Sequence, residues 1–298
     1  MIIIQLLGGL GNQMFQYALG RRLANDFQTT FSVDRFLLED HSTGRHAVNR
    51  NFDLDIFAAD IPRANILMTM KYSAWGLPRP LRPVARALGV TNEGRQTLER
   101  SFGFDSDVLR CGPDAYISGT WQSIRYFDSI EEILKEDFQF RHPIMPEALH
   151  IEKAICGTNA ICLHVRRTDF LSHKDSKNPL GFVGLDYYRN GVKRILEESS
   201  DAEFFVFSDD LEWCREELTF VPRITFVSGQ YAGVKCSSYL QLMKMCRHFL
   251  IPNSTFSWWA AWLCPHASKT VYVPDQWFRD PKMDASGLYP EGWIRITI

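Results

Sequence analysis

The second half of the chain alternates short apolar runs with longer amphipathic stretches in a regular rhythm. The runs are rich in β-branched and aromatic residues, which predicts buried strands, and the stretches carry apolar residues at helical spacing. Strands are predicted over 160–166, 204–208, 224–227, 248–252 and 270–273, and helices over 147–156, 185–199, 237–246 and 256–263, with another helix opening at Asp209-Asp210. Strands separated by helices indicate an α/β fold with a doubly wound parallel sheet.

The first half is less regular. Residues 1–7 form a β-rich run, a glycine-rich turn starts at Gly8, and Phe15, Leu19 and Leu23 then fall on one helical stripe. Short β-like runs and polar turns fill 28–66, a strand leads into a polar aromatic loop over 115–127, and a helix is predicted over 128–140.

With 298 residues, the chain can form one large domain or two of ordinary size. Residues 141–146 are the most plausible crossover, so we expect an N-terminal domain over 1–145 and a C-terminal domain over 146–298.

Polar clusters stand where three of the predicted strands end: His164–Asp169, Ser208–Asp210 and Asn253–Thr255. Because the carboxyl ends of parallel strands meet at one edge of a sheet, we expect these clusters to form one site. The alternative for the first cluster is a core strand followed by a solvated charged loop.

These side chains suit a pyrophosphate. Arg166 offers a planar guanidinium, and Ser254 and Thr255 stand at a predicted helix N-terminus beside backbone N–H groups. Asp209 or Asp210 can accept hydrogen bonds from guanine or from ribose hydroxyls, although a helix N-cap is the alternative and we expect one of the two to serve as such. The residues alone therefore predict a two-domain enzyme that binds a nucleoside diphosphate in its C-terminal half.

The turn around Gly9 and Gly11 is not a dinucleotide fingerprint, because the third glycine would be required at Met14. It is not a Walker A loop either, since no Gly-Lys-[Ser/Thr] follows. Two interpretations stay open: contact with an anion or a sugar, or a tight strand-to-helix turn.

Composition limits the classes of ligand and the cellular location that we expect. The net charge of -2 gives no support for nucleic-acid binding, and seven cysteines without a Cys-x-x-Cys pair favour reduced thiols over a disulfide framework or a zinc site. The N-terminus lacks the features of a signal peptide, and no window reaches the roughly 18 apolar residues that span a bilayer. We expect a cytoplasmic protein.

Four other stretches carry hypotheses. Asp53-Leu-Asp55 and Asp105-Ser-Asp107 could hold a divalent metal, but surface turns or helix caps are the favoured interpretation. Residues 71–100 hold six basic and two acidic residues interleaved with apolar ones, which suits peripheral attachment to an anionic membrane or, more simply, a solvated basic face. Trp121, Gln122 and Tyr126 suit a bound sugar, or could fill a domain interface.

The chain resembles bacterial α1,2-fucosyltransferases, glycosyltransferase family 11. Five motifs carry the resemblance in the family's order, and the C-terminal Tyr289-Pro-Glu-Gly-Trp293 adds to it; they are Gly8-Gly-Leu-Gly-Asn-Gln-Met-Phe-Gln-Tyr-Ala18, Gly119-Thr-Trp-Gln-Ser-x-x-Tyr-Phe127, His164-Val-Arg-Arg-Thr-Asp169, Phe207-Ser-Asp-Asp210 and Asn253-Ser-Thr-Phe-Ser-Trp-Trp-Ala-Ala-Trp262. The resemblance implies a GT-B-like architecture, with two Rossmann-like halves facing a cleft. It implies the inverting transfer of L-fucose from GDP-β-L-fucose to O2 of a terminal β-galactoside, with no metal and no cofactor, in O-antigen or surface polysaccharide synthesis. The acceptor could be lipid-linked.

Site roles follow from the resemblance. Arg166 is implied as the pyrophosphate ligand and Arg167 as structural, pairing with a carboxylate. His164 and Asp209 are implied guanine contacts, and Ser254 and Thr255 phosphate contacts. The remaining expected donor contacts are Ser208, Asn253, Gly9 and Gly11, and Asn12 and Gln13 belong to the loop that reaches the reacting centre.

We expect Arg166 and Asn12 to take part in catalysis, with Asp169 and Asp186 as candidate bases and a baseless mechanism as an equal rival. The acceptor contacts are expected at Gln13, Trp121 and Gln122. One departure from the family pattern is Thr168, where the motif often has glycine.

Three rivals remain. A GDP-fucose-dependent transferase with a protein or chitin-like acceptor would keep the nucleotide site and change the first half. A non-catalytic GDP-sugar-binding module would bind without turnover. An NAD-dependent dehydrogenase is disfavoured by the missing third glycine.

Overall fold

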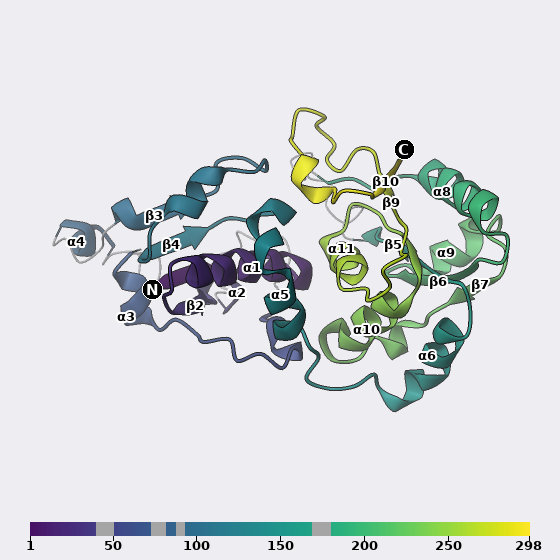
Figure 1. The fold of residues 1–298 in the computed structure, drawn as a ribbon, viewed down its shortest axis with the longest axis horizontal. Coiled ribbons are helices and arrows are strands. Elements are labelled where there is room, and N and C mark those ends of the chain that lie inside the picture. The colour runs from purple at the N-terminus through teal and green to yellow at the C-terminus, as the bar shows by residue number, and fades with distance from the viewer. Residues whose placement is uncertain (40–50, 73–81, 88–92, 169–179) are drawn as a thin grey trace. The chain divides into compact units, whose positions relative to one another are not determined.

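The computed structural model describes residues 1–39, 51–72, 82–87, 93–168 and 180–298. The chain divides into two compact units, Met1–Gln139 with Ser286–Leu288 and Phe140–Ala285 with Tyr289–Ile298. The boundary expected after residue 145 lies a little beyond the observed one, and the short piece near the C-terminus belongs to the first unit. Each unit is an α/β fold built on its own parallel sheet (Figure 1).

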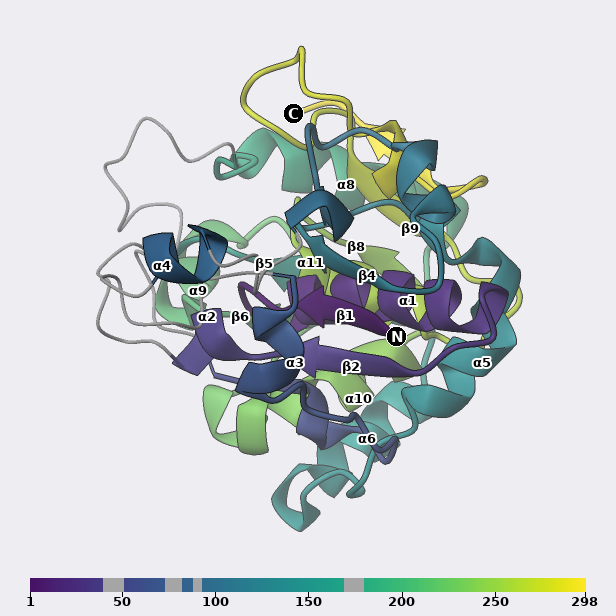
Figure 2. The same cartoon turned by 90° about the vertical axis from the view of Figure 1, so that its left-hand side faces the viewer.

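The first unit contains a four-stranded parallel sheet in the order β2-β1-β4-β3. In Figure 2, β4, β1 and β2 are seen as neighbouring arrows. The strands are β1 (Ile2–Gln5), β2 (Phe31–Asp34), β3 (Gln96–Leu98) and β4 (Ala115–Ser118). The helices are α1 (Leu10–Asp26), α2 (Phe36–Glu39), α3 (Ile66–Met70), α4 (Arg82–Ala87) and α5 (Glu131–Asp137).

Helix α1 is the central helix of this unit. The predicted stripe of Phe15, Leu19 and Leu23 is confirmed, because all three side chains are fully buried. Two glutamines of the same helix, Gln13 and Gln16, are also fully buried. A helix buried beyond its apolar stripe must satisfy its polar side chains internally, and both glutamines do so at the candidate site.

The second unit contains a six-stranded parallel sheet in the order β10-β9-β8-β5-β6-β7. The strands are β5 (Ala160–Val165), β6 (Glu203–Ser208), β7 (Ile224–Phe226), β8 (His248–Leu250), β9 (Val271–Pro274) and β10 (Ile294–Ile296). The helices are α6 (Leu149–Cys156), α8 (Leu185–Glu198), α9 (Leu211–Glu217), α10 (Ser237–Met245) and α11 (Thr255–Trp262). The five predicted strands are all present, but the sequence pattern missed β10, which is short and keeps Arg295 exposed at the sheet edge.

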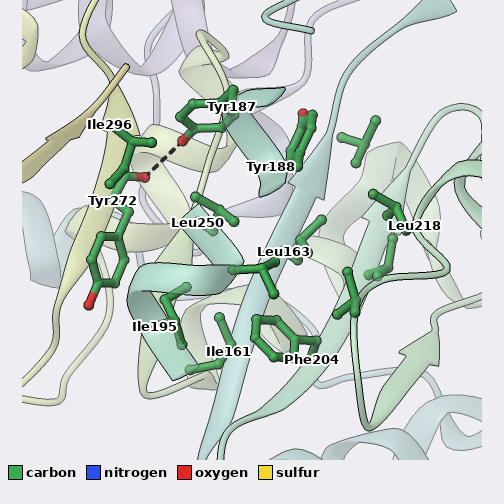
Figure 3. Packing of buried hydrophobic residues seen from close by; sticks show 14 of the residues in the cluster. Ile161, Leu163, Tyr187, Tyr188, Ile195, Phe204, Leu218, Leu250, Tyr272 and Ile296 are labelled. Carbon is green, nitrogen blue, oxygen red and sulfur yellow. Dashed lines mark hydrogen bonds between the residues drawn. The ribbon is translucent and has the colours of Figure 1, made fainter. Parts of the chain in front are cut away.

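The alternation along β5 decides which side chains reach which face. Ile161 and Leu163 enter a cluster with Tyr187, Tyr188 and other residues of α8 (Figure 3). Helix α9 packs on the same face through Cys214 and Leu218. The opposite face of β5 carries Cys162 and His164. The strand therefore delivers one imidazole to the functional edge while the rest of it stays apolar.

Candidate active site

The order of the second sheet identifies its functional edge. Counted along the chain, the strands stand 3-2-1-4-5-6, so the chain changes direction between β5 and β8. In open α/β sheets, ligands bind outside the carboxyl ends of the strands at such a switch point. His164 lies near the end of β5 and Arg166 follows the strand directly, while Asn253–Thr255 follow β8 beside it. The fold therefore brings together the clusters that the sequence pointed to.

His164 is a buried neutral imidazole. It is 5% exposed, and its Nδ1 has no hydrogen-bond partner among the described residues. Burial, reinforced by the nearby Arg166 and opposed by Asp209, lowers the pKa of His164 to about 3. The hydroxyl of Tyr188 donates to the His164 carbonyl over 3.2 Å and fixes the end of the strand. A buried ring atom without a protein partner marks a place where a ligand can supply one.

The two arginines after β5 have different surroundings. Arg167 pairs with the Asp210 carboxylate and lies 5.1 Å from the centre of the Trp213 ring, which confirms its predicted structural pairing. Arg166 Nη1 lies 3.4 Å from Asp209 Oδ2, and the Arg166 side chain is 30% exposed. A partly exposed guanidinium at a switch point is suited to bind a diphosphate.

The Ser208–Asp210 cluster organises this edge. Asp210 caps α9 by accepting from Trp213 N over 3.2 Å, so the expected helix cap is confirmed. Ser208 Oγ accepts from Asp210 N over 2.9 Å. Asp209 accepts from the backbone N–H groups of Arg167 and Thr168, at 2.9 and 3.2 Å, and from the Thr168 hydroxyl at 2.5 Å.

The Asn253–Thr255 cluster opens α11. Asn253 is 3% exposed and donates to the carbonyls of Gly181 and Trp277 at 3.0 and 2.9 Å, while its Oδ1 has no partner among the described residues. Ser254 is the N-cap residue of α11, and its side chain makes no capping hydrogen bond. The structure therefore gives Asn253 a positioning role between two loops, and the Ser254 hydroxyl does not cap α11.

In the first unit, side-chain amides hold the glycine-rich turn. Gly8 has φ +77, and a side chain there would collide with Asn12. Gln13 Nε2 donates to the carbonyls of Gly8 and Asn51 at 3.0 and 2.8 Å, and its Oε1 accepts from Asp53 N at 2.9 Å. Both N–H groups of this expected acceptor contact are thus occupied by backbone carbonyls, which favours a positioning role for Gln13.

Gln16 connects two strand-end loops. Its Oε1 accepts from Leu7 N at 3.0 Å, and its Nε2 donates to the carbonyls of Leu7 and Gly119 at 3.2 and 3.0 Å. A second bridge joins Gln122 Nε2 to Asn12 Oδ1 at 3.1 Å. Asn12 and Gln122 therefore lie together, as their expected roles require.

The loop after β4 is held by a residue that the sequence did not suggest. Glu99 accepts from Thr120 N and Thr120 Oγ1 at 2.6 and 2.7 Å, and from Trp121 N at 2.9 Å. Trp121 itself is fully buried and packs edge-on against Tyr126, with ring centres 5.6 Å apart. Stacking of a sugar on Trp121 would require this ring to leave the core, so the structure favours Gln122 over Trp121 as an acceptor contact.

The candidate bases and metal motifs complete the comparison with the sequence. Asp169 lies outside the described residues. Asp186 is exposed in the first turn of α8, where a carboxylate stabilises the helix dipole. Asp105 caps a 3-10 helix through Asp107 N, and Asp107 pairs with Arg110, so this triplet is a cap as favoured. Within the described ranges, no group of three His, Cys, Asp or Glu residues is arranged to hold a metal ion.

Among the residues that the structure describes, no helix is both long and apolar enough to cross a membrane.

Sequence reasoning missed Gln16, Glu99 and the tyrosine pair Tyr187-Tyr188. The pair stood in an amphipathic pattern and could have been recognised as core, whereas the other two carry no local signal.

Two Rossmann-like units in one chain, the second with its polar clusters at the switch point, define a GT-B-like α/β fold. The chain belongs to glycosyl transferase family 11, which matches residues 98–297. This confirms the family that the motifs suggested.

Two curated relatives from Escherichia coli cover nearly the whole chain. An alpha-1,2-colitosyltransferase is 28% identical over 99% of this chain and 98% of its own length. The O-antigen biosynthesis glycosyltransferase WbnK is 27% identical over 98% and 99%. Galactoside alpha-(1,2)-fucosyltransferase 1 of Leontocebus fuscicollis is 25% identical over 62% of this chain and 53% of its own length.

Solved structures agree on the fold. Fucosyltransferase NodZ from Bradyrhizobium superposes with a TM-score of 0.51 at 15% identity, covering 89% of this chain and 93% of its own. A mutant of Arabidopsis thaliana FUT1 in complex with GDP gives a TM-score of 0.52 at 11% identity, covering 92% and 70%. At these identities the likeness shows the architecture alone.

Proposed function

We propose that this glycosyltransferase transfers L-fucose, with inversion, from GDP-β-L-fucose to O2 of a terminal β-galactoside. The observation that carries the proposal is the partly exposed Arg166 guanidinium at the switch point of a family 11 chain. The relatives support the α1,2 linkage, because two of them are named for it.

The donor lies on the second unit in this proposal. Arg166 and the start of α11 at Ser254 and Thr255 bind the pyrophosphate, and His164, whose Nδ1 has no partner among the described residues, lies on the guanine side. Burial lowers the His164 pKa to about 3, so the ring is neutral at physiological pH and adds no charge to the site. Gly9 and Gly11 of the first unit also contact the donor.

The acceptor lies on the first unit, near Asn12 and Gln122. As the glycosidic bond breaks, the sugar gains oxocarbenium character and the departing GDP gains negative charge. Arg166 and the N-terminus of α11 stabilise that charge, and such preorganised electrostatic stabilisation is usually the largest catalytic contribution. Asp169 and Asp186 remain candidate bases beside a dissociative mechanism that needs none.

The deciding experiment is a transfer assay with GDP-fucose, excess EDTA and a panel of β1,3- and β1,4-galactosides, with product linkage read by NMR. We expect an α1,2-fucosylated product in EDTA, and relative rates then rank the acceptors. GDP binding without product would keep the nucleotide site and direct the search to lipid-linked, protein or chitin-like acceptors, or to a non-catalytic module. Absence of both product and GDP binding would refute the proposal.

Colitosyl transfer is a second candidate, because a relative matched over nearly the whole chain is an alpha-1,2-colitosyltransferase. Colitose is fucose without its 3-hydroxyl, so one donor site could accept either sugar. A site that hydrogen-bonds this hydroxyl would reject the deoxy sugar by about 10⁴-fold. Competition between GDP-fucose and GDP-colitose measures this ratio, and a preference for GDP-colitose would replace fucose in the proposal.

The proposed setting is the cytoplasm, with contact to the inner face of the inner membrane through residues 71–100. Exposed apolar side chains in or near this segment support the contact; they are Ile66, Leu67, Val84 and Leu98. Sedimentation with anionic vesicles tests it at low and physiological salt, and a protein that stays in the supernatant at both has no such contact.

A further inference from the structure

Both carboxylate oxygens of Asp209 are occupied by the loop that follows β5. Oδ1 accepts from Arg167 N at 2.9 Å, and Oδ2 accepts from Thr168 N at 3.2 Å and from Thr168 Oγ1 at 2.5 Å. The Arg166 guanidinium lies 3.4 Å from the same Oδ2. The Asp209 side chain is 15% exposed, whereas its partner Thr168 is exposed to solvent.

This geometry competes with a guanine contact. A carboxylate that recognises guanine accepts from N1–H and N2–H₂ through both oxygens at once. Oδ2 of Asp209 already accepts two hydrogen bonds and faces a guanidinium, which leaves little of its acceptor capacity. The same pattern recurs at Glu99, which also binds two successive backbone N–H groups and a threonine hydroxyl after a neighbouring strand. In both units the carboxylate holds a loop.

We propose that Asp209 is a positioning residue for Arg166 and that Thr168 completes this loop clamp. The inference rests on the proposed function, because it assigns to Arg166 the diphosphate of the donor. A carboxylate beside a diphosphate repels it, so Asp209 favours binding only through the geometry it imposes on the guanidinium. The Thr168 hydroxyl adds a bond that glycine, frequent here in the family motif, cannot supply.

The test compares GDP with inosine diphosphate, which lacks the guanine N2 amine. Calorimetry measures both affinities for the wild type, Asp209→Ala, Thr168→Val and Thr168→Ser. We expect Asp209→Ala to weaken GDP about 10- to 50-fold and Thr168→Val about 3- to 10-fold. Thr168→Ser keeps a hydroxyl and should stay within about twofold of the wild type. The ratio of GDP to inosine diphosphate affinity should not change in any variant.

Two controls isolate the mechanism. Glu212→Ala removes an exposed carboxylate from the first turn of α9 and should leave GDP affinity unchanged. In an Arg166→Ala background, Asp209→Ala should cause no further loss, because its effect passes through the arginine. Thermal unfolding identifies any variant that fails to fold. If Asp209→Ala does not fold, the test rests on Thr168→Val, which keeps the shape of the side chain.

The outcomes separate the two proposals. If the wild type does not bind GDP, the proposed function fails. If it binds GDP but Asp209→Ala changes the ratio of GDP to inosine diphosphate affinity about fivefold or more, the residue reads the base and the inference is wrong. An unchanged GDP affinity in Asp209→Ala or in Thr168→Val would also overturn it.

Discussion

Glu99 in the first unit and Asp209 in the second hold strand-end loops in the same way, yet their surroundings differ in charge. Glu99 follows β3 and holds Thr120 and Trp121 after β4, next to loops that the neutral amides of Gln16 and Gln122 connect. Asp209 follows β6 and lies beside Arg166, while the adjacent Asp210 pairs with Arg167.

The difference shows what each edge is suited to bind. Buried amides satisfy backbone groups without creating a net charge, so the loops after β1 and β4 suit uncharged sugar hydroxyls. Paired carboxylates and guanidiniums fix a positive group where a diphosphate can reach it, which suits the loop after β5. A carboxylate thus holds a strand-end loop in both units, at a neutral sheet edge in the first unit and at a charged edge in the second.

The largest expected effect comes from removing the positive group of the charged edge. Arg166→Ala should lower the transfer rate about 10²- to 10³-fold, or about 2.7–4 kcal/mol, because the charge on departing GDP loses its partner. Steady-state kinetics measures the rate, and circular dichroism checks the fold. A variant that keeps more than about a tenth of the wild-type rate would remove Arg166 from its proposed role.

The next effect tests the neutral edge. Gln16→Ala should lower the free energy of unfolding by about 2–4 kcal/mol, since it leaves a buried N–H and two carbonyls without partners. Urea denaturation measures the loss. Gln139→Ala is the matched control, because that amide makes one bond from an exposed position and should change stability by less than about 0.5 kcal/mol. Equal losses in both variants would show that Gln16 is not a structural bridge.

A pH experiment tests the buried imidazole of the charged edge. The folded protein holds the His164 pKa at about 3, below the ordinary value near 6.5. As the pH falls below 6.5, the unfolded state therefore binds a proton at this residue, whereas the folded state does not. Stability should therefore be fully retained above that pH and fall by about 2 kcal/mol between pH 7.5 and 5 because of this residue. Urea midpoints of the wild type and His164→Asn at both pH values give the difference, and identical pH dependence would mean that folding does not lower the His164 pKa.

The smallest expected effect distinguishes the role of Glu99 from that of Asp209. Glu99→Gln should lower the free energy of unfolding by about 1 kcal/mol, because the loop at Thr120 loses a charged acceptor. GDP affinity, measured by calorimetry, should not change. A loss of GDP affinity as large as that of Asp209→Ala would show that the two carboxylates do not have separate roles.

Much of the architecture could be predicted from the sequence. Local periodicity decides whether a segment is a strand or a helix, and it identified the buried stripe of Phe15, Leu19 and Leu23 and the first five strands of the second sheet. Polar residues directly after those strands identified the edge at His164 and Asn253, because parallel strands end together. The strand β10 was missed, since three residues at an exposed edge give too short a pattern.

The sequence by itself determined the two α/β units, the family and the residues at the switch point. Only the tertiary structure decided which of these residues face a ligand and which hold the loops. From the sequence, Gln13 and Asp209 fit a role in ligand binding as well as a role in holding a loop. The partners that decide between these roles, Asn51 and Thr168, lie far away along the chain. Hydrogen-bond partners brought together by folding leave no periodic signal, so the roles of these two residues become visible only when the strands stand side by side.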